Sequence, residues 1–391
     1  MRKFQRFLAS VIAFAVLYGV YRYSFRTDSE GNYLFLLPGE GGRSVSVEQK
    51  APVSSEREHS VDHFRLANFT GFEYVVANDI CKENSSFSEL LGVILVTSYV
   101  GHDEIRSAHR QAISQQKLLS MGLLRIFSLG TIPPTERFIT QAAIEAEQRQ
   151  HGDLIQGNFV EAYRNLTYKH LMSLQWATQH CRGAKYLLKM DDDIVYDPFY
   201  IQNYLSDLNQ GEERRSHLLA GYVFRSKKVI RLQANKWYVS RDEFPADVYP
   251  PYLSGWLYIT DQRTARALVA ESQTGSFFWI DDTFITGVLA QRLQIQPIAL
   301  NRWYSSNSEF LDCCIRDMKR YSYQCDYYVG PNGGNGKLIM EFIQELERCY
   351  DNACYQRPAG KSLTATCVAE YKQQVNPDHG TAMISQMKLK K

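Results

Sequence analysis

An apolar run that ends in three consecutive aspartates constrains this sequence most. Residues 186–190 have the length and composition of a buried strand. Asp191, Asp192 and Asp193 follow, at the strand end where open α/β sheets bind ligands. Since side chains alternate along an extended chain, we expect Asp191 and Asp193 to face the same way. Such a pair predicts a site for Mn²⁺ or Mg²⁺, and the alternative is a solvated acidic turn.

Apolar runs and polar helical segments alternate around this strand. We expect further strands at 90–98, 123–129, 153–156 and 218–224, and helices at 102–120, 136–150, 163–181 and 282–293. On the helix at 163–181, a stripe is predicted to face the core: Tyr163, Leu166, Leu174, Ala177 and Cys181. This alternation predicts an α/β fold with a mostly parallel sheet.

The N-terminus and the overall charge limit the class of protein. Of the 391 residues, 45% are apolar and 22% charged, with a net charge of +2, so a nucleic-acid surface is not expected. Residues 1–6 are basic and residues 7–25 largely apolar, which predicts a cytosolic tail and a membrane anchor. A cleaved signal peptide is the alternative. Residues 26–88 are expected to form a stem, or else a small N-terminal subdomain.

Cysteines and sequons indicate a secretory-pathway chain. Six of the eight cysteines fall between Cys313 and Cys367 without zinc-type spacing, so disulfides are predicted and their pairing stays open. Sequons begin at Asn68, Asn84 and Asn165. We expect residues 311–391 to be an appended, disulfide-linked extension.

Several blocks, taken in order, closely resemble the β-1,3-galactosyltransferase family, which includes β-1,3-N-acetylglucosaminyltransferases and is related to Fringe. They lie at 153–156, 163–169, 189–193, 237–238, 249–255 and 281–284. The resemblance covers about residues 90–300. It implies a GT-A-type, Rossmann-like fold over 89–310 and a type II Golgi membrane protein with a lumenal catalytic domain. It also implies a UDP-sugar donor, Mn²⁺ (or Mg²⁺) and inversion at the anomeric carbon.

The resemblance also suggests roles for the acidic residues. Asp193 would ligate the metal, with Asp191 as a second ligand, and Asp191 and Asp192 would hold the donor ribose or bound water. Lys189 would orient these carboxylates or offset their charge, unless it points to solvent. Asp282 would be the general base on the acceptor hydroxyl, although an aspartate before a helix is also a common N-cap.

Further residues are expected to line the donor and sugar sites. Arg106 and Arg110 match the arginines that bind the nucleotide, and a solvated helix face is the alternative. The sugar pocket would include Tyr252, Ser254, Gly255, Trp256 and Asp281, together with Tyr258, and core packing is the alternative for the two aromatic residues Trp256 and Tyr258.

Two departures from the family pattern stand out. Gln111 and its neighbours replace the tryptophan that usually follows the second arginine. Between Asp282 and His379 the chain has no histidine to complete a metal site.

These features predict a β-1,3-hexosyltransferase that moves galactose from UDP-galactose to the 3-hydroxyl of an acceptor glycan on a protein or lipid. UDP-N-acetylglucosamine is the alternative donor. A catalytically inactive lumenal chaperone or lectin would not need both Asp193 and Asp282. A metal-dependent phosphatase or nuclease would not explain the block at 249–255.

Overall fold

The computed structural model describes residues 65–83, 90–211, 217–352 and 354–367. The predicted cytosolic tail and anchor, most of the predicted stem and the sequon at Asn84 lie outside these ranges. Within them, no helix combines the length and apolar character that a bilayer crossing needs. The anchor therefore stays a prediction.

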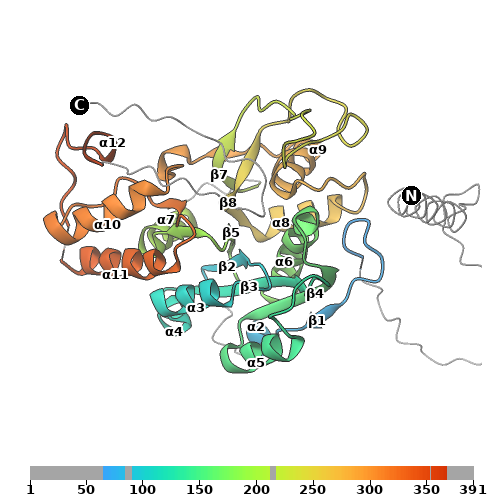
Figure 1. Cartoon of the computed structure of the whole chain (residues 1–391), viewed down its shortest axis with the longest axis horizontal. Helices are drawn as coiled ribbons and strands as arrows, with labels where there is room; N and C mark the ends of the chain where they lie inside the picture. Colours follow the sequence, from blue (N-terminus) through green and yellow to red (C-terminus); the bar gives the residue numbers. More distant parts are fainter. Residues whose placement is uncertain (1–64, 84–89, 212–216, 353, 368–391) are drawn as a thin grey trace, which may run out of the picture. The chain divides into compact units, whose positions relative to one another are not determined.

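A central sheet organises the described part of the chain (Figure 1). Its eight strands follow the order β1-β4-β3-β2-β5-β8-β7-β9. Their bounds are β1 Tyr74–Val76, β2 Gly92–Thr97, β3 Leu123–Thr131, β4 Leu154–Val160, β5 Tyr186–Asp191, β7 Leu219–Phe224, β8 Tyr252–Asp261 and β9 Ile298–Ala299. Strands β4, β3, β2 and β5 are parallel neighbours, whereas β8 runs antiparallel to both β5 and β7. The predicted α/β fold with a mostly parallel sheet is confirmed.

The remaining regular structure of the described chain is mainly helical. Their bounds are α2 Ile80–Glu83, α3 Asp103–Ala112, α4 Gln115–Ser120, α5 Gln141–His151, η2 Tyr163–Asn165, α6 Leu166–His180, α7 Pro198–Gln210, α8 Gln262–Glu271, η3 Thr283–Leu289, α9 Ala290–Arg292, η4 Asn301–Trp303, α10 Glu309–Tyr321, α11 Gly336–Asn352 and α12 Leu363–Thr366. The single helix expected at 102–120 is two helices. Ser114 caps α4 by accepting from Lys117 N, and Arg125 donates to the carbonyls of His109 and Ile113, which end α3.

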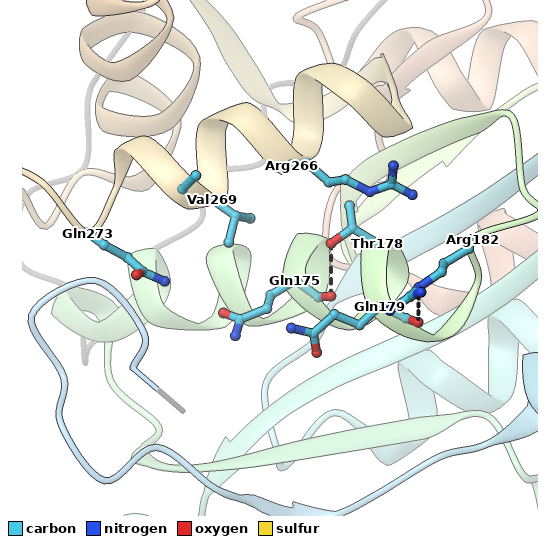
Figure 2. Close-up of a pocket in the computed structure, with 8 residues that line it drawn as sticks. Gln175, Thr178, Gln179, Arg182, Arg266, Val269 and Gln273 are labelled. Atoms are coloured by element: carbon cyan, nitrogen blue, oxygen red, sulfur yellow. Dashed lines mark hydrogen bonds between the residues drawn. The ribbon is translucent and has the colours of Figure 1, made fainter. Parts of the chain in front are cut away.

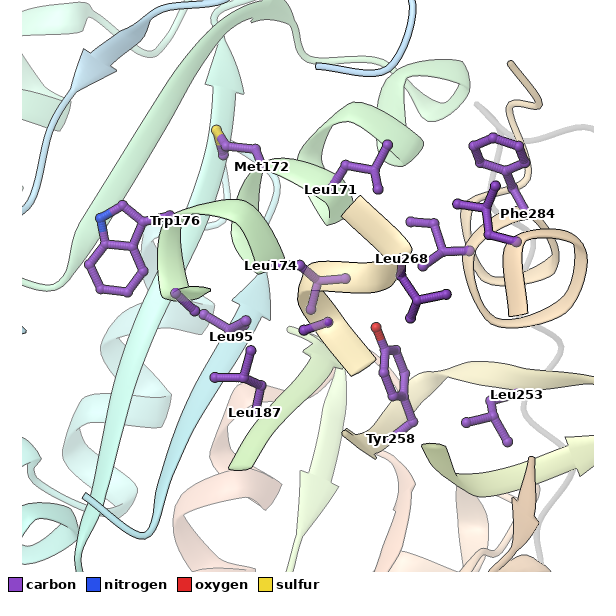
Figure 3. Packing of buried hydrophobic residues seen from close by; sticks show 14 of the residues in the cluster. Leu95, Leu171, Met172, Leu174, Trp176, Leu187, Leu253, Tyr258, Leu268 and Phe284 are labelled. Carbon is purple, nitrogen blue, oxygen red and sulfur yellow. The ribbon is translucent and has the colours of Figure 1, made fainter. Parts of the chain in front are cut away.

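Apolar side chains cover both faces of the sheet. One cluster packs α6, α8 and η3 against the sheet, and Figure 3 shows Leu95, Leu187 and Tyr258 of the strands within it. The other cluster packs α3, α7, α10 and α11 on the opposite face. Burial on both faces explains why β2 is apolar along its length.

The stripe expected on the helix at 163–181 is buried only in part. Leu174, Ala177 and Cys181 are in the core, but Tyr163 is 47% exposed. The chain forms the 3₁₀ turn η2 before α6 begins, which changes the direction of Tyr163. The prediction of a core-facing Tyr163 was therefore wrong.

The segment after residue 310 shares the main core. Leu311, Val329 and Phe342 belong to the same apolar cluster as Ile94 of β2. Strand β10 (Val329–Pro331) pairs antiparallel with β6 (Ile194–Tyr196), directly after the aspartates. The described part of this segment is thus integral to the fold rather than an appendage.

All eight cysteines are paired, which confirms the predicted disulfides. The pairs are Cys81–Cys181, Cys313–Cys367, Cys314–Cys325 and Cys349–Cys354.

Candidate active site

The three aspartates lie where β5 ends, at the carboxyl edge of the parallel strands. Asp191 is the last residue of β5, whereas Asp192 and Asp193 form a turn before β6. The alternation assumed for the sequence therefore stops at Asp191, and each aspartate has its own surroundings.

Asp191 is fixed by a buried lysine. Lys189 is 1% exposed, and its Nζ donates to Asp191 Oδ1 over 2.7 Å and to the Gly255 carbonyl over 2.9 Å. Thr97 Oγ1 donates to the same Asp191 oxygen over 2.9 Å. Burial lowers the pKa of Lys189, but Asp191 and Asp281 outweigh it and leave this pKa above its ordinary value. The lysine is charged and oriented toward the carboxylates, so the solvent-facing alternative is wrong.

Asp192 turns inward instead. Its Oδ2 accepts from Ser98 Oγ at 2.7 Å and from the Tyr99 amide at 3.3 Å, and it lies 2.9 Å from His102 Nδ1. Burial raises the pKa of Asp192, yet His102 and Ser98 outweigh this and hold it below the ordinary value. Since the ionised carboxylate only accepts, His102 Nδ1 must donate. The geometry gives Asp192 a role in positioning His102 and the end of β2.

Asp193 is the aspartate most open to solvent. Its side chain is exposed, but surrounding protein together with the charges of Asp191 and Asp192 raises its pKa to about 7. Its carbonyl accepts from the Asn332 amide over 2.9 Å, which ties the turn to the segment after β10. The negative charges of Asp191 and Asp192 contribute to this rise after burial, and a bound cation would offset them.

The residues present fit a divalent cation that also binds substrate. Asp193 and the partly exposed Asp191 offer hard oxygen ligands of the kind that Mg²⁺ and Mn²⁺ accept. Among the described residues, no cluster of three or more His, Cys, Asp or Glu could hold a metal ion alone. Substrate phosphates and water would have to supply the remaining ligands.

A second acidic pair lies beside the first. Asp281 Oδ2 is 2.9 Å from His170 Nδ1 and 3.6 Å from Lys189 Nζ. Burial raises the pKa of Asp281, but Lys189 and His170 outweigh it and hold it below the ordinary value. In contrast, burial and the charge of Asp281 raise the pKa of Asp282 to about 7. One carboxyl of this pair is thus held ionised, and the other can take up a proton near neutral pH.

Asp282 both caps a helix and faces the site. Its Oδ1 accepts from the Thr283 amide over 2.6 Å at the start of η3, as the N-cap alternative requires. Its Oδ2 accepts only a long hydrogen bond of 3.3 Å, from the Gly255 amide. The cap therefore occupies one carboxylate oxygen and leaves the other able to accept a proton.

Gly255 of β8 joins the two acidic groups. A Cβ at this position would lie 3.2 Å from Lys189 Nζ, 3.6 Å from Asp191 Oδ2 and 3.6 Å from Asp282 Cβ. Any larger residue would fill the space between the predicted metal side and the predicted base side. This close approach accounts for the glycine in the block at 249–255.

The other predicted sugar-pocket residues divide between site and core. Burial raises the pKa of Tyr252, and the nearby negative charge of Asp282 raises it further. Tyr258 is fully buried and its hydroxyl lies 2.6 Å from His170 Nε2, so the core alternative holds for it. Trp256 is partly buried against the α3 face, and Ser254 is 5% exposed.

The two predicted nucleotide arginines are paired with acids. Arg106 is 1% exposed and donates to both carboxylate oxygens of Glu147, at 2.8 and 2.7 Å. Arg110 donates to both oxygens of Asp153 and also pairs with Glu147. Neither arginine lies on a solvated helix face, so that alternative is wrong. Both side chains pair with Glu147 or Asp153 rather than with the aspartate triplet. A direct contact to the nucleotide stays a prediction.

Two of the predicted sequons lie in the described chain. Asn68 is exposed and its Oδ1 accepts from Tyr168. Asn165 is partly buried and donates to the Val160 carbonyl over 2.8 Å. Glycosylation at these residues stays a prediction.

The sequence interpretation missed several residues around the aspartates. Thr97, Ser98 and His102 hold the triplet, and His170 holds Asp281. Thr97 is the direct partner of Asp191 in the parallel β2–β5 register. A comparison of neighbouring strand ends could have found Thr97 and Ser98.

A separate surface depression of about 540 Å³ lies between α6 and α8 (Figure 2). Its lining residues include Gln175, Arg182 and Arg266, and it touches none of the carboxylates. The lining comes from the end of α6 that is remote from His170, so this depression is not part of the candidate site.

Comparisons with known proteins show similarity to galactosyltransferases. Residues 104–301 match the family described as Galactosyltransferase. The chain is 34% identical over 209 residues to "Beta-1,3-galactosyltransferase brn" of Drosophila melanogaster, which covers 52% of this chain and 60% of that protein. It is 31% identical over 268 residues to "Beta-1,3-galactosyltransferase 5" of Homo sapiens, covering 67% of this chain and 80% of that protein.

Among solved structures, the chain matches one of galactosyltransferase LgtC in complex with donor and acceptor sugar analogs, at a low level of similarity. The identity is 8% and the TM-score 0.32, over 68% of this chain and 98% of that chain. At this TM-score the two structures do not superpose closely enough to match residues.

Proposed function

Because the chain belongs to the galactosyltransferase family and is a glycosyltransferase, we propose that it transfers galactose from UDP-galactose to the 3-hydroxyl of an acceptor sugar, with inversion. The observation that carries this proposal is the arrangement around Gly255. A Cβ built on this glycine would lie 3.6 Å from both Asp191 Oδ2 and Asp282 Cβ, so the predicted metal side and the predicted base side lie next to one another, as a single site for donor and acceptor requires.

Each residue has a defined task in the proposed reaction. Asp282 Oδ2 accepts the proton of the acceptor hydroxyl as that oxygen attacks the anomeric carbon. Asp193 and Asp191 would hold the divalent cation, which offsets the charge that grows on the departing diphosphate. Lys189 orients Asp191 through a hydrogen bond and helps to keep Asp281 ionised. The bond from the anomeric carbon to the UDP oxygen breaks as the new glycosidic bond forms.

The proposal includes a compartment and a chain layout. We propose a type II Golgi membrane protein with residues 7–25 as its anchor and a lumenal catalytic domain. The four disulfides support an oxidising compartment, where such bonds persist. The catalytic unit would need the segment beyond residue 310, since β10 and α11 pack into its core.

A donor screen tests the proposal. The full-length protein is incubated with UDP-galactose, UDP-N-acetylglucosamine or UDP-glucose, Mn²⁺ and simple acceptor glycosides, and the product linkage is determined by NMR. We expect a β-1,3-galactoside. Transfer of N-acetylglucosamine would show that UDP-N-acetylglucosamine, not UDP-galactose, is the donor. An α-linked product would refute inversion. No transfer with any donor would support a catalytically inactive relative.

A further inference from the structure

An aromatic surface with no role in the proposed chemistry lies near Asp282. It consists of Tyr163, Trp237 and Trp279, which we call the aromatic shelf. Trp237 Nε1 donates to the Tyr163 hydroxyl over 2.7 Å, and the rings of Tyr163 and Trp279 meet edge to face at 5.9 Å. Tyr163 is 47% and Trp237 37% exposed, whereas Trp279 is 5% exposed. Two large rings are thus presented to solvent in a fixed geometry.

The shelf is held beside the acidic pair by the start of α6. Thr167 Oγ1 donates to the Phe278 carbonyl over 2.9 Å, and His170 Nδ1 lies 2.9 Å from Asp281. The helix therefore runs along residues 278–282, with Tyr163 at one end next to Trp279. The pKa of Tyr163 is raised to about 12, mainly by burial. The negative charges of Asp281 and Asp282 also raise it, as expected for neighbouring groups.

The loop that carries Trp237 is ordered by one arginine. The guanidinium of Arg231 donates to four backbone carbonyls of the loop, those of Val239, Ser240, Phe244 and Ala246. The Phe244 ring packs 5.5 Å from that of Phe278 and anchors the loop beside the acidic pair. Trp237 is exposed on a braced segment, so a ligand would not have to order it on binding.

Two cations lie over the rings. Lys236 Nζ lies 4.5 Å from the Trp237 ring centre and 5.2 Å from that of Tyr163, and the Arg164 guanidinium lies 4.4 Å from the ring centre of Trp279. Trp279 Nε1 is buried and has no hydrogen-bond partner among the described residues. The surface thus combines aromatic rings with two cationic groups, Lys236 and Arg164, that can donate hydrogen bonds. A sugar ring has the complementary pattern, a C–H face surrounded by hydroxyl oxygens.

We propose that the aromatic shelf binds the pyranose ring of the acceptor, with Tyr163 and Trp237 under its apolar face and the reacting hydroxyl toward Asp282. This inference rests on the proposed function, since Asp282 must be the base. It assigns acceptor recognition to the loop before β8 and to η2, separately from the donor side at Asp191 and Asp193. Changes in the shelf should affect acceptor binding and leave the donor untouched.

The test separates acceptor from donor kinetics in the full-length protein. Trp237→Ala is compared with Trp237→Phe, and with Leu232→Ala as the matched control, because Leu232 is 67% exposed on the same loop. The probes are benzyl glycosides of galactose, N-acetylglucosamine, N-acetylgalactosamine and xylose, with UDP-galactose and Mn²⁺. We expect Trp237→Ala to raise the acceptor KM about tenfold, with Trp237→Phe closer to wild type. The donor KM and the Leu232→Ala kinetics should not change.

Saturation-transfer NMR with the same glycosides, in the presence of UDP, measures binding without turnover. An unchanged acceptor KM and unchanged glycoside binding in Trp237→Ala would overturn the shelf, as would the absence of binding by the wild-type protein. If the wild-type protein binds a glycoside without glycosylating it, and Trp237→Ala loses that binding, the shelf stands and the proposed function fails.

Discussion

The Nζ of Lys189 donates to Oδ1 of Asp191 over 2.7 Å, from a position that solvent does not reach. The same ammonium lies 3.6 Å from Asp281. One buried cation therefore serves the two acidic groups on which the proposed chemistry depends.

We predict that Lys189→Met destabilises the protein by about 2–5 kcal/mol, because it leaves Asp191 and Asp281 without their buried counter-charge. Urea unfolding measures the change. Lys185→Met is the control, since Lys185 is exposed at the start of the same strand and should cost less than about 0.5 kcal/mol. Equal effects of the two substitutions would show that the ion pairs contribute nothing.

We predict that Asp282→Asn lowers kcat by about 10²–10⁴-fold and leaves UDP binding intact. The amide can still accept from the Thr283 amide and cap η3, so the fold should survive. Single-turnover kinetics and calorimetric titration of UDP measure the two quantities. A variant with more than about a tenth of wild-type kcat would move the base elsewhere, and loss of UDP binding would assign Asp282 to the donor side.

The pH profile should follow the pKa of Asp282, which burial and Asp281 raise to about 7. Below this value the carboxyl group is protonated and cannot accept the acceptor proton. We therefore expect kcat/KM to fall about tenfold for each pH unit below about 7 and to level off above it. The residual rate of Asp282→Asn should lack this limb, and a wild-type profile that is flat from pH 5 to 8 would contradict the assignment.

Activity should require a divalent cation. Excess EDTA, or Asp193→Ala, should lower transfer at least about 100-fold, because the cation would offset the charge that grows on the leaving diphosphate. Added Mn²⁺ should restore the EDTA-treated wild-type enzyme and not the variant. Asp207→Ala, at an exposed position on α7, provides the control. Full turnover in EDTA would refute the metal site.

The stability lost when a disulfide is removed should depend on the length of the loop that the bond closes. Cys81 and Cys181 are 100 residues apart, whereas Cys349 and Cys354 are 5 apart. By chain entropy, replacing the first pair with serine should cost about 4–5 kcal/mol and replacing the second about 2 kcal/mol. Urea unfolding of the two double variants measures the difference, and the reverse order would show that native packing outweighs loop closure.

The sequence predicted those parts of the site that local patterns encode. The apolar run before Asp191 and the helix after Asp282 both mark the ends of secondary-structure elements, and both ends lie at the site. Partners that depend on register could not be read locally. Ser98 and His102 reach Asp192 because β2 lies beside β5, a contact across 94 and 90 residues of chain.

The arginines and Tyr163 show a second limit of local patterns. Arg106 and Arg110 lie one helical turn apart, which predicts a shared face but not what that face meets. In the fold it meets Glu147 and Asp153, acids that come later in the chain. Tyr163 fits a helical stripe, but the chain forms a 3₁₀ turn there, and one turn of different geometry changes a core residue into an exposed one.

The pairing of β10 with β6 determines how much of the chain must be synthesised before the proposed active site can form. The Asn332 amide holds the Asp193 carbonyl, so the turn that carries the proposed metal ligand is braced by residues made long after it. During synthesis, the first 300 residues can form most of the sheet before this brace exists. A nascent chain would therefore acquire the proposed sugar-transfer activity only after residues 329–332 have been made and have folded back onto β6.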